Sequence, residues 1–205
     1  MNRQQRAEAT PLDSWPLADT TESPSRSLYA VEVSCRQSAF PSTGAFEVLR
    51  TTDGRGAGIR ARRPFERGTL VARVSGHLIP ERKLHTLQIR PDLHLYDPHF
   101  CGLFLHACDP NVFLDMQACE VWAMRDIAAG ELVTMDYTQS EDVLHRQFHC
   151  LCGAPNCRGW ITGRKERPNT EGKRVLSELR SSRSGRVHGV VGAVRAGVQP
   201  GRVGT

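Results

Sequence analysis

Three cysteines lie close together late in the chain. Cys150, Cys152 and Cys157 fall within eight positions, and Gly-Ala-Pro-Asn separates the last two. A short spacing with turn-forming residues is typical of thiols that bind one zinc ion. Structural zinc takes four ligands, with Zn–S bonds of about 2.3 Å, so the fourth ligand must come from elsewhere in the chain. The alternative is a group of reduced surface thiols without a metal. Three further cysteines, expected to be ordinary buried thiols, are Cys35, Cys101 and Cys119.

A tyrosine lies thirteen residues before this cluster. Tyr137 ends the apolar segment 131–137, which is expected to be a strand. A phenol with a pKa of about 10 is a poor base at neutral pH, so its chemical role would be to position a reactant. Tyrosines at strand ends are more often packing residues. The residues alone leave both roles open.

A glycine-rich turn precedes Ile59 and contains Gly54, Gly56 and Gly58. Glycine permits positive φ and lets a ligand approach the backbone closely. The turn lacks the strand-to-helix context of a dinucleotide site, because no helical period follows Ile59. Taken alone, it is most simply a hairpin turn.

The elements that would position these residues are mainly short strands. Strand-forming segments separated by turn residues predict a mainly β fold. The expected strands cover residues 28–34, 46–50, 69–75, 86–90, 93–96, 112–116, 120–124 and 131–137. Residues 1–27 have no periodicity and are expected to be disordered. Residues 170–182 form at most a marginal amphipathic helix, since their apolar stripe is thin and includes Gly172. No regular structure is expected after Ser182.

Composition narrows the class of protein. The chain has 205 residues, of which 39% are hydrophobic, and no apolar run reaches the about 20 residues of a membrane span. The basic N-terminus has no apolar signal segment behind it. Seven cysteines, an odd number, favour reduced thiols and an intracellular protein.

Charge is unevenly distributed along the chain. Residues 158–205 contain eleven Lys/Arg and three Asp/Glu, against sixteen and nineteen in residues 1–157. The basic tail, residues 164–205, is expected to be mostly disordered. It offers a weak contact to nucleic acid or another anion, and a solvated end is the commoner alternative.

Four segments, in this order, resemble the SET domain, the fold of S-adenosylmethionine-dependent protein-lysine methyltransferases. They are Arg55-Gly-Ala-Gly-Ile-Arg-Ala61, Leu105-His-Ala-Cys-Asp-Pro-Asn111, Gly130-Glu-Leu-Val-Thr-Met-Asp-Tyr137 and the cysteine segment, which is similar to a post-SET segment. The likeness covers residues 46–163 and is to short SET proteins without a pre-SET module. It implies a fold of several small sheets with a SET domain over 28–148 and a C-terminal post-SET zinc segment over 149–163. It also implies a pseudoknot in which the second and third segments thread past each other.

The resemblance implies the residues of a site as well. The residues that would contact S-adenosylmethionine are Gly56, Ala57, Gly58, Leu105, His106, Tyr137 and Trp160. Tyr137 would be the catalytic residue, placing a substrate lysine amine and steering the methyl group, and His106 would act through its backbone. Cys108 would be the fourth zinc ligand, with His149 as the fallback. For Trp160, stacking on the adenine ring and ordinary core packing are both open.

Two residues depart from the family motif. Leu105 and Ala107 stand where the family has asparagine and serine, and Leu105 removes a polar contact to the cofactor. The leading hypothesis is methyl transfer to a lysine of a protein or peptide, with no membrane involved. The departures favour an alternative, a catalytically decayed SET-fold module that still contains zinc. A third hypothesis, binding of nucleic acid by the basic tail, lacks the interleaved aromatic residues that such segments use.

Overall fold

The structure is a computed structural model that describes residue 28 and residues 40–191. The first strands are β1 (Phe46–Arg50), β2 (Ala57–Ala61), β3 (Leu70–Arg73), β4 (His77–Ile79), β5 (Thr86–Arg90) and β6 (Leu93–Tyr96). The later strands are β7 (Leu105–His106), β8 (Val112–Asp115), β9 (Glu120–Ala123), β10 (Thr134–Met135), β11 (Phe148–His149) and β12 (Trp160–Ile161). The helices are the 3-10 helix η2 (Cys101–Leu103) and the α-helices α1 (Tyr137–Ser140) and α2 (Thr170–Val191). The prediction of a mainly β fold is confirmed.

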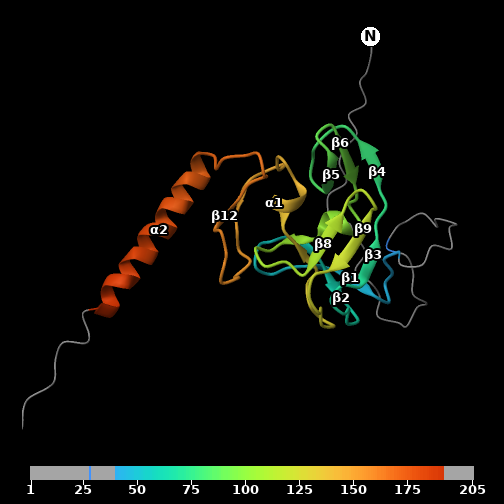
Figure 1. Ribbon diagram of the computed structural model, residues 1–205, viewed down its shortest axis with the longest axis horizontal. Coiled ribbons are helices and arrows are strands. Elements are labelled where there is room, and N and C mark those ends of the chain that lie inside the picture. Colours follow the sequence, from blue (N-terminus) through green and yellow to red (C-terminus); the bar gives the residue numbers. More distant parts are fainter. Residues whose placement is uncertain (1–27, 29–39, 192–205) are drawn as a thin grey trace, which may run out of the picture.

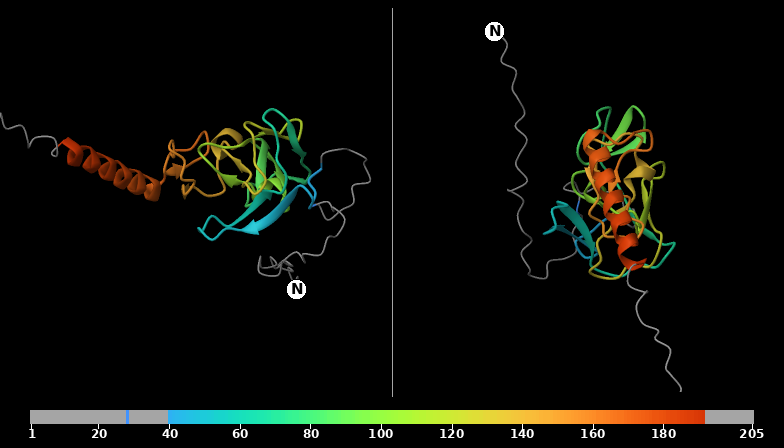
Figure 2. Two further views of the ribbon diagram at one scale, coloured as in Figure 1. Left: turned by 90° about the horizontal axis from the view of Figure 1, so that it is seen from below. Right: turned by 90° about the vertical axis from the view of Figure 1, so that its left-hand side faces the viewer.

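The strands form small separate sheets. Their orders are β1-β2, β3-β9-β8, β4-β6-β5, β10-β7 and β11-β12. All pairs are antiparallel except β7 with β10, which are parallel. Figure 1 shows strands β1 to β6, β8 and β9 gathered in one body, with α1 beside it and β12 farther out. α2 points away from this body in the left view of Figure 2, and in the right view it is seen in front of the body.

The main core is built around four phenylalanines that are almost fully buried. The Phe46 ring stacks on Phe65 at a centroid distance of 5.3 Å and meets Phe100 edge-on at 4.9 Å. Phe100 in turn meets Phe104 at 4.9 Å. Aromatic contacts of this kind add specific geometry to apolar burial. The core therefore fixes Phe104, the residue immediately before β7.

A buried carboxylate shapes the turn that leads to β7. Asp97 has no exposed surface, and its oxygens accept hydrogen bonds from the backbone N–H groups of His99, Phe100 and Cys101 at 2.8–3.0 Å. The Cys101 thiol also donates to Asp97, at 2.9 Å. Cys101 is buried, as expected, whereas Cys119 is half-buried.

The prediction of one long strand over 131–137 is wrong. Only Thr134–Met135 is a strand there, and Tyr137 begins α1. The Asp136 side chain accepts the N–H of Thr138 at 3.0 Å, which caps this short helix and ends the extended chain. The sequence prediction also lacks β2, β4, β7, β11 and β12.

The C-terminal region is more helical than predicted. α2 begins at Thr170, where a helix is expected, but it ends at Val191. The expectation of no regular structure after Ser182 is therefore wrong for residues 183–191. No helix within the described ranges is long and apolar enough to cross a membrane. The expectations for residues 1–27, 29–34, Cys35 and 192–205 lie outside the described residues.

Candidate active site and cysteine cluster

Two short parallel strands bring the histidine segment beside the tyrosine segment. In the pair of β7 with β10, Leu105 lies opposite Thr134 and His106 opposite Met135. Just after β7, the Ala107 N–H donates to the Met135 carbonyl at 3.0 Å. The expected meeting of these segments is confirmed, and the pseudoknot threading stays a prediction.

The side chain of Asn111 holds this junction from inside. Asn111 is fully buried, and its Oδ1 accepts the Thr134 N–H at 2.8 Å. Its Nδ2 donates to the Leu132 carbonyl at 2.8 Å and to the Glu131 carboxylate at 3.2 Å. Leaving such buried groups unpaired costs about 1–3 kcal/mol each. Sequence analysis gave Asn111 no role, and its only signal was a polar residue at the end of the histidine segment.

The Tyr137 hydroxyl is fixed at the edge of the main core. It donates to the Phe104 carbonyl at 2.6 Å. The ring packs edge-on against His106 and Phe148, with centroids 5.4 and 5.8 Å away. Burial, with the nearby Glu141 carboxylate, raises the pKa of Tyr137 above its ordinary value. Tyr137 is therefore a neutral phenol whose proton points to Phe104 and whose oxygen lone pairs remain for another group.

The His106 ring joins the tyrosine segment to the cysteines. Its Nδ1 accepts the Tyr137 backbone N–H at 3.3 Å, and its Nε2 lies 3.4 Å from both Cys108 Sγ and the Arg158 guanidinium. Burial lowers the pKa of His106 to about 4, against the opposing attraction of Asp136. The ring is neutral at physiological pH. His106 thus has a structural role through its side chain that sequence analysis did not assign.

A second contact joins the tyrosine and cysteine segments. The Arg158 guanidinium donates to the Asp136 carboxylate at 2.5 Å. Asp136 is mostly buried, so loss of Arg158 would leave a buried charge without its partner. Sequence analysis missed this pair. The only signal in the sequence for this pair was position, because Asp136 precedes Tyr137 and Arg158 follows Cys157, and both neighbours were assigned roles.

The four expected metal ligands lie together. The sulfur atoms of Cys108, Cys150, Cys152 and Cys157 are all within 4.8 Å of one another, and those of Cys108 and Cys150 are 3.8 Å apart. A tetrahedral zinc ion with Zn–S bonds of about 2.3 Å has sulfur–sulfur edges of about 3.8 Å, so the set fits one ion. His149 is exposed and is not among the grouped residues of the described chain, which removes it as the fallback.

The surroundings of the cluster shift the pKa values of its thiols in both directions. The Arg158 N–H donates to Cys108 Sγ at 3.3 Å. Burial raises the pKa of the Cys150 thiol. At Cys152 burial is outweighed by hydrogen bonds from the backbone of Cys108 and Ala154, and the pKa falls to about 7. Zinc binds the deprotonated form of cysteine, so the N–H donors at Cys108 and Cys152 favour metal binding, whereas the burial that raises the pKa of Cys150 and Cys157 opposes it.

Comparison with known proteins agrees with this geometry. A family model described as SET domain matches residues 56–138. Residues 56–138 are thus identified as similar to a SET domain. The matched range contains the glycine turn, β7, β10 and Tyr137, and it ends before the cysteines at 150–157.

Three proteins similar to this chain are methyltransferases by name. Methyltransferase flvH of Aspergillus flavus is 27% identical over 137 residues, which are 64% of this chain and 74% of that protein. Histone-lysine N-methyltransferase ash1 of Drosophila melanogaster is 28% identical and covers 66% of this chain but 7% of its own length. The H3 lysine-4 specific histone-lysine N-methyltransferase of Saccharomyces cerevisiae is 40% identical over 63 residues, 27% of this chain and 6% of that protein. The chain thus spans most of the first relative and a small part of the other two.

In the structure the glycine turn adjoins β7. Gly56 has a φ of +96°, a left-handed conformation that favours glycine, and the space where its Cβ would stand is open. A Cβ at Gly58 would lie 2.9 Å from the Leu105 side chain. Leu105 therefore fills the space over Gly58. The Gly56 carbonyl accepts hydrogen bonds from the Thr51 N–H and hydroxyl, so the opening at Gly56 is the space where a side chain would stand. Cofactor contact by these residues stays a prediction.

Trp160 lies under the first turn of α2. It is 5% exposed, and its indole N–H donates to Gln147 at 3.1 Å. A Cβ at Gly172 would overlap the indole, so the helix backbone rests directly on the ring. Trp160 therefore packs against α2, as one of its two alternatives predicts, and stacking on an adenine ring stays a prediction.

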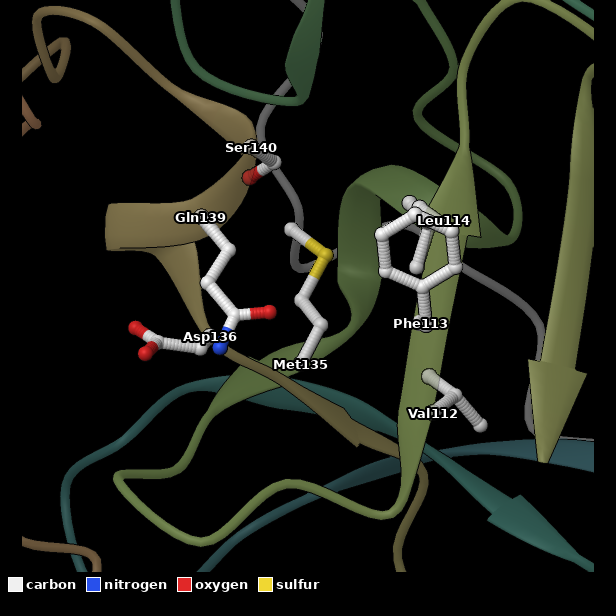
Figure 3. A pocket seen from close by; sticks show the side chains of 7 residues that line it. All are labelled: Val112, Phe113, Leu114, Met135, Asp136, Gln139 and Ser140. Atoms are coloured by element: carbon white, nitrogen blue, oxygen red, sulfur yellow. The ribbon is translucent and has the colours of Figure 1, made fainter. Parts of the chain in front are cut away.

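A cavity of about 250 Å³ opens beside Tyr137. Its lining includes Arg82, Lys83, Met135, Tyr137, Glu141 and Phe148. Glu141 accepts the Gln88 N–H at 3.0 Å, and burial raises the pKa of its carboxyl to about 7. Met135 also lines a second hollow, of about 20 Å³, which has room for about one water molecule. Figure 3 shows the Met135 side chain between Gln139 and Phe113 in this smaller hollow.

Proposed function

We propose that this protein transfers a methyl group from S-adenosylmethionine to the side-chain amine of a lysine in a protein or peptide. The names of the relatives support the reaction class, and two of those names specify histone lysine. The observation that carries the proposal is the fixed hydroxyl of Tyr137. Tyr137 lines a cavity, and its hydroxyl donates its proton to the Phe104 carbonyl, so its lone pairs are not used by that bond.

The cofactor would supply an electrophilic methyl group on a sulfonium sulfur. The open space at Gly56 fits a ligand that approaches the backbone closely. The residues proposed to form its seat are Gly56, Ala57, Gly58, Leu105 and His106. Leu105 has no polar side chain to offer, so its contact would use backbone groups. Trp160 is proposed as a cofactor neighbour only at its outer edge, because α2 covers the ring face near Gly172.

Tyr137 would orient the substrate rather than remove its proton. Its lone pairs can accept a hydrogen bond from a lysine amine or from the polarised methyl group. Alignment of bound reactants can supply about 7–11 kcal/mol of barrier reduction. A free lysine has a pKa of about 10.4 and must become neutral to react. Desolvation in the cavity, together with the cations Arg82 and Lys83 in its lining, would lower that pKa.

The four cysteines would hold one structural zinc ion. The segment after α1 has a small core of its own, in which Leu144, Cys150 and Ile161 are the buried apolar residues. Tyr137 and Phe148 pack against this core. A metal bound here would therefore stabilise the wall of the cavity. Reduced thiolate ligands suit an intracellular protein.

The alternative of a decayed module has no observation in its favour. The two residues that depart from the motif both fit the fold. Leu105 packs on Gly58 within β7, and the Ala107 N–H donates to the Met135 carbonyl. Calorimetric titration with S-adenosylmethionine would separate the two hypotheses, because a decayed module should produce no binding heat.

The deciding experiment measures methyl transfer from labelled S-adenosylmethionine to a peptide array. Tyr137→Phe should lower transfer by about 10–100-fold, because orientation of the reactants is lost while the ring stays. Tyr96→Phe is the matched control, since Tyr96 lies on β6 and not in the cavity lining, and it should retain transfer. Circular dichroism should show both variants folded. Equal labelling by wild type and Tyr137→Phe would remove Tyr137 from the mechanism.

A further inference from the structure

The mouth of the cavity beside Tyr137 carries a row of cationic or basic side chains. Arg82, Lys83, His145 and Arg146 all line the cavity and are all exposed, so they lie where it opens to solvent. We call these four residues the basic rim. The acidic residue in the lining is Glu141, which is buried and is held by the Gln88 N–H.

The charges of this rim are not neutralised by neighbouring acids. Elsewhere on the described surface, arginines and lysines commonly form ion pairs, as Arg73 does with Glu120 and Lys165 with Asp142. Within the described residues, no carboxylate lies in ion-pair distance of a rim side chain. Lys83 instead stands 4.0 Å from the centre of the Tyr96 ring, which holds its ammonium group in place.

Arg82 differs from the other rim residues. Its charge acts on two carboxylates: it opposes the rise in the Glu141 pKa that burial causes, and it adds to the hydrogen bonds that lower the pKa of Glu166. Lys83 and Arg146 are exposed and form no ion pair within the described residues, so their charges face solvent. A cavity mouth with unpaired cations attracts anions and repels cations.

We propose that the basic rim selects target lysines that are flanked by acidic residues in the substrate. This inference rests on the proposed function, because it assigns the cavity to the substrate lysine. Each acidic flanking residue would gain an ion pair at the rim, and a flanking arginine or lysine would face like charge. The occupant is thus an acidic protein segment, in contrast to a strongly basic tail. The same cations favour the neutral form of the lysine amine that must react.

The test uses the full chain and three synthetic peptides with one central lysine. The peptides differ only in four flanking residues, which are all Glu, all Gln or all Arg. Fluorescence anisotropy measures binding, and mass spectrometry measures methyl transfer with S-adenosylmethionine. The Glu peptide should bind about tenfold more tightly than the Gln peptide, since exposed ion pairs each contribute a few-fold. The Arg peptide should bind weakest. Raising the salt to about 0.5 M should reduce these differences, because exposed charges are screened.

The variant Lys83→Glu/Arg146→Glu reverses two rim charges and leaves Arg82 beside Glu141. It should lose the preference for the Glu peptide and favour the Arg peptide. The matched control, Lys173→Glu/Arg180→Glu, makes the same charge change on exposed residues of α2 and should keep the original ranking.

The possible outcomes separate the two proposals. Methylation of all three peptides with equal efficiency would overturn the rim inference and support the proposed function. The expected binding order without methylation of any peptide would support the rim and count against the proposed function. An equal change of ranking in the α2 control would overturn the rim inference, because net charge alone would then explain the preference.

Discussion

At the scale of single residues, Glu141 makes stability depend on pH. Its folded-state pKa is about 7, raised by burial from an ordinary 4.5, with Arg82 and Arg164 opposing the rise. Between these values the folded protein keeps a proton that the unfolded chain has lost. Raising the pH from 4.5 to 7 therefore lowers the free energy of unfolding, by up to about 3 kcal/mol from this group. The loss is complete above pH 7.

Glu141→Gln should remove the fall in the free energy of unfolding that Glu141 causes as the pH rises, because glutamine does not titrate. Its side-chain oxygen can still accept the Gln88 N–H. Thermal unfolding of wild type and variant at pH 5 and pH 8 checks it. The Tm of the variant relative to wild type should be clearly higher at pH 8 than at pH 5. The pH dependence of the cysteine cluster is the same in both proteins, so it cancels when the Tm of the wild type is subtracted from that of the variant. Glu178→Gln, an exposed control paired with Arg174, should show no such trend, and parallel behaviour of Glu141→Gln would contradict the assignment.

Single residues also explain where the sequence prediction of strands fails. The pattern over 131–137 favours one strand, but this segment changes partners along its length. The Val133 N–H donates to the Ile59 carbonyl of β2. The Asn111 side chain donates to the Leu132 carbonyl and accepts the Thr134 N–H. A continuous ladder with β7 would need the same groups. Periodicity cannot show this, because a distant side chain supplies the competing hydrogen bonds.

At the scale of elements, α2 depends on a glycine that counts against it in the sequence. Gly172 lowers helix propensity by about 1 kcal/mol relative to alanine. In the structure, the absent side chain lets the helix backbone lie on the Trp160 indole. Val175 is buried one turn later, so docking and not propensity positions α2. Docking of this kind has no local signal, and the helix was therefore expected to be marginal.

Gly172→Ala should consequently raise helix propensity and still weaken the docking of α2. A methyl group there overlaps a rigid ring, which can move only if the helix moves. Fluorescence of Trp160, in a background with Trp15→Phe and Trp122→Phe, should shift to longer wavelength as the indole becomes exposed to water. Ser177→Ala, an exposed position on the same helix, should leave the emission unchanged. An unshifted spectrum in Gly172→Ala would show that the helix does not rest on the indole.

At the scale of the whole molecule, the chain has two cores of very different size. The main core gathers residues from β1 through β10, whereas the core of the cysteine segment has three buried apolar residues. So few apolar side chains cannot hold a segment with two strands and an attached helix. The close spacing of Cys150, Cys152 and Cys157 in the sequence indicates three of the four metal ligands. Cys108 is 42 positions from Cys150, and its place became clear only through resemblance and then through the pairing of β7 with β10.

Metal removal should therefore unfold one part of the protein first. We expect one zinc ion per chain by mass spectrometry under native conditions. A chelator, or Cys108→Ser, should release it and lower the Tm, because folding of the segment is coupled to metal binding. Hydrogen exchange should speed up over residues 144–163 and the start of α2, with much less change in β1, β2, β3 and β9. Methyl transfer should fall in parallel, since Phe148 packs against Tyr137.

Cys119→Ser is the control, because Cys119 is half-buried and its sulfur lies outside the cluster. It should keep the zinc ion and the exchange pattern of the wild type. Uniformly faster exchange over both cores after metal removal would mean that the molecule unfolds as one unit. Unchanged exchange at residues 144–163 would mean that the small core is stable without a metal, and the structural role proposed for zinc would then be wrong.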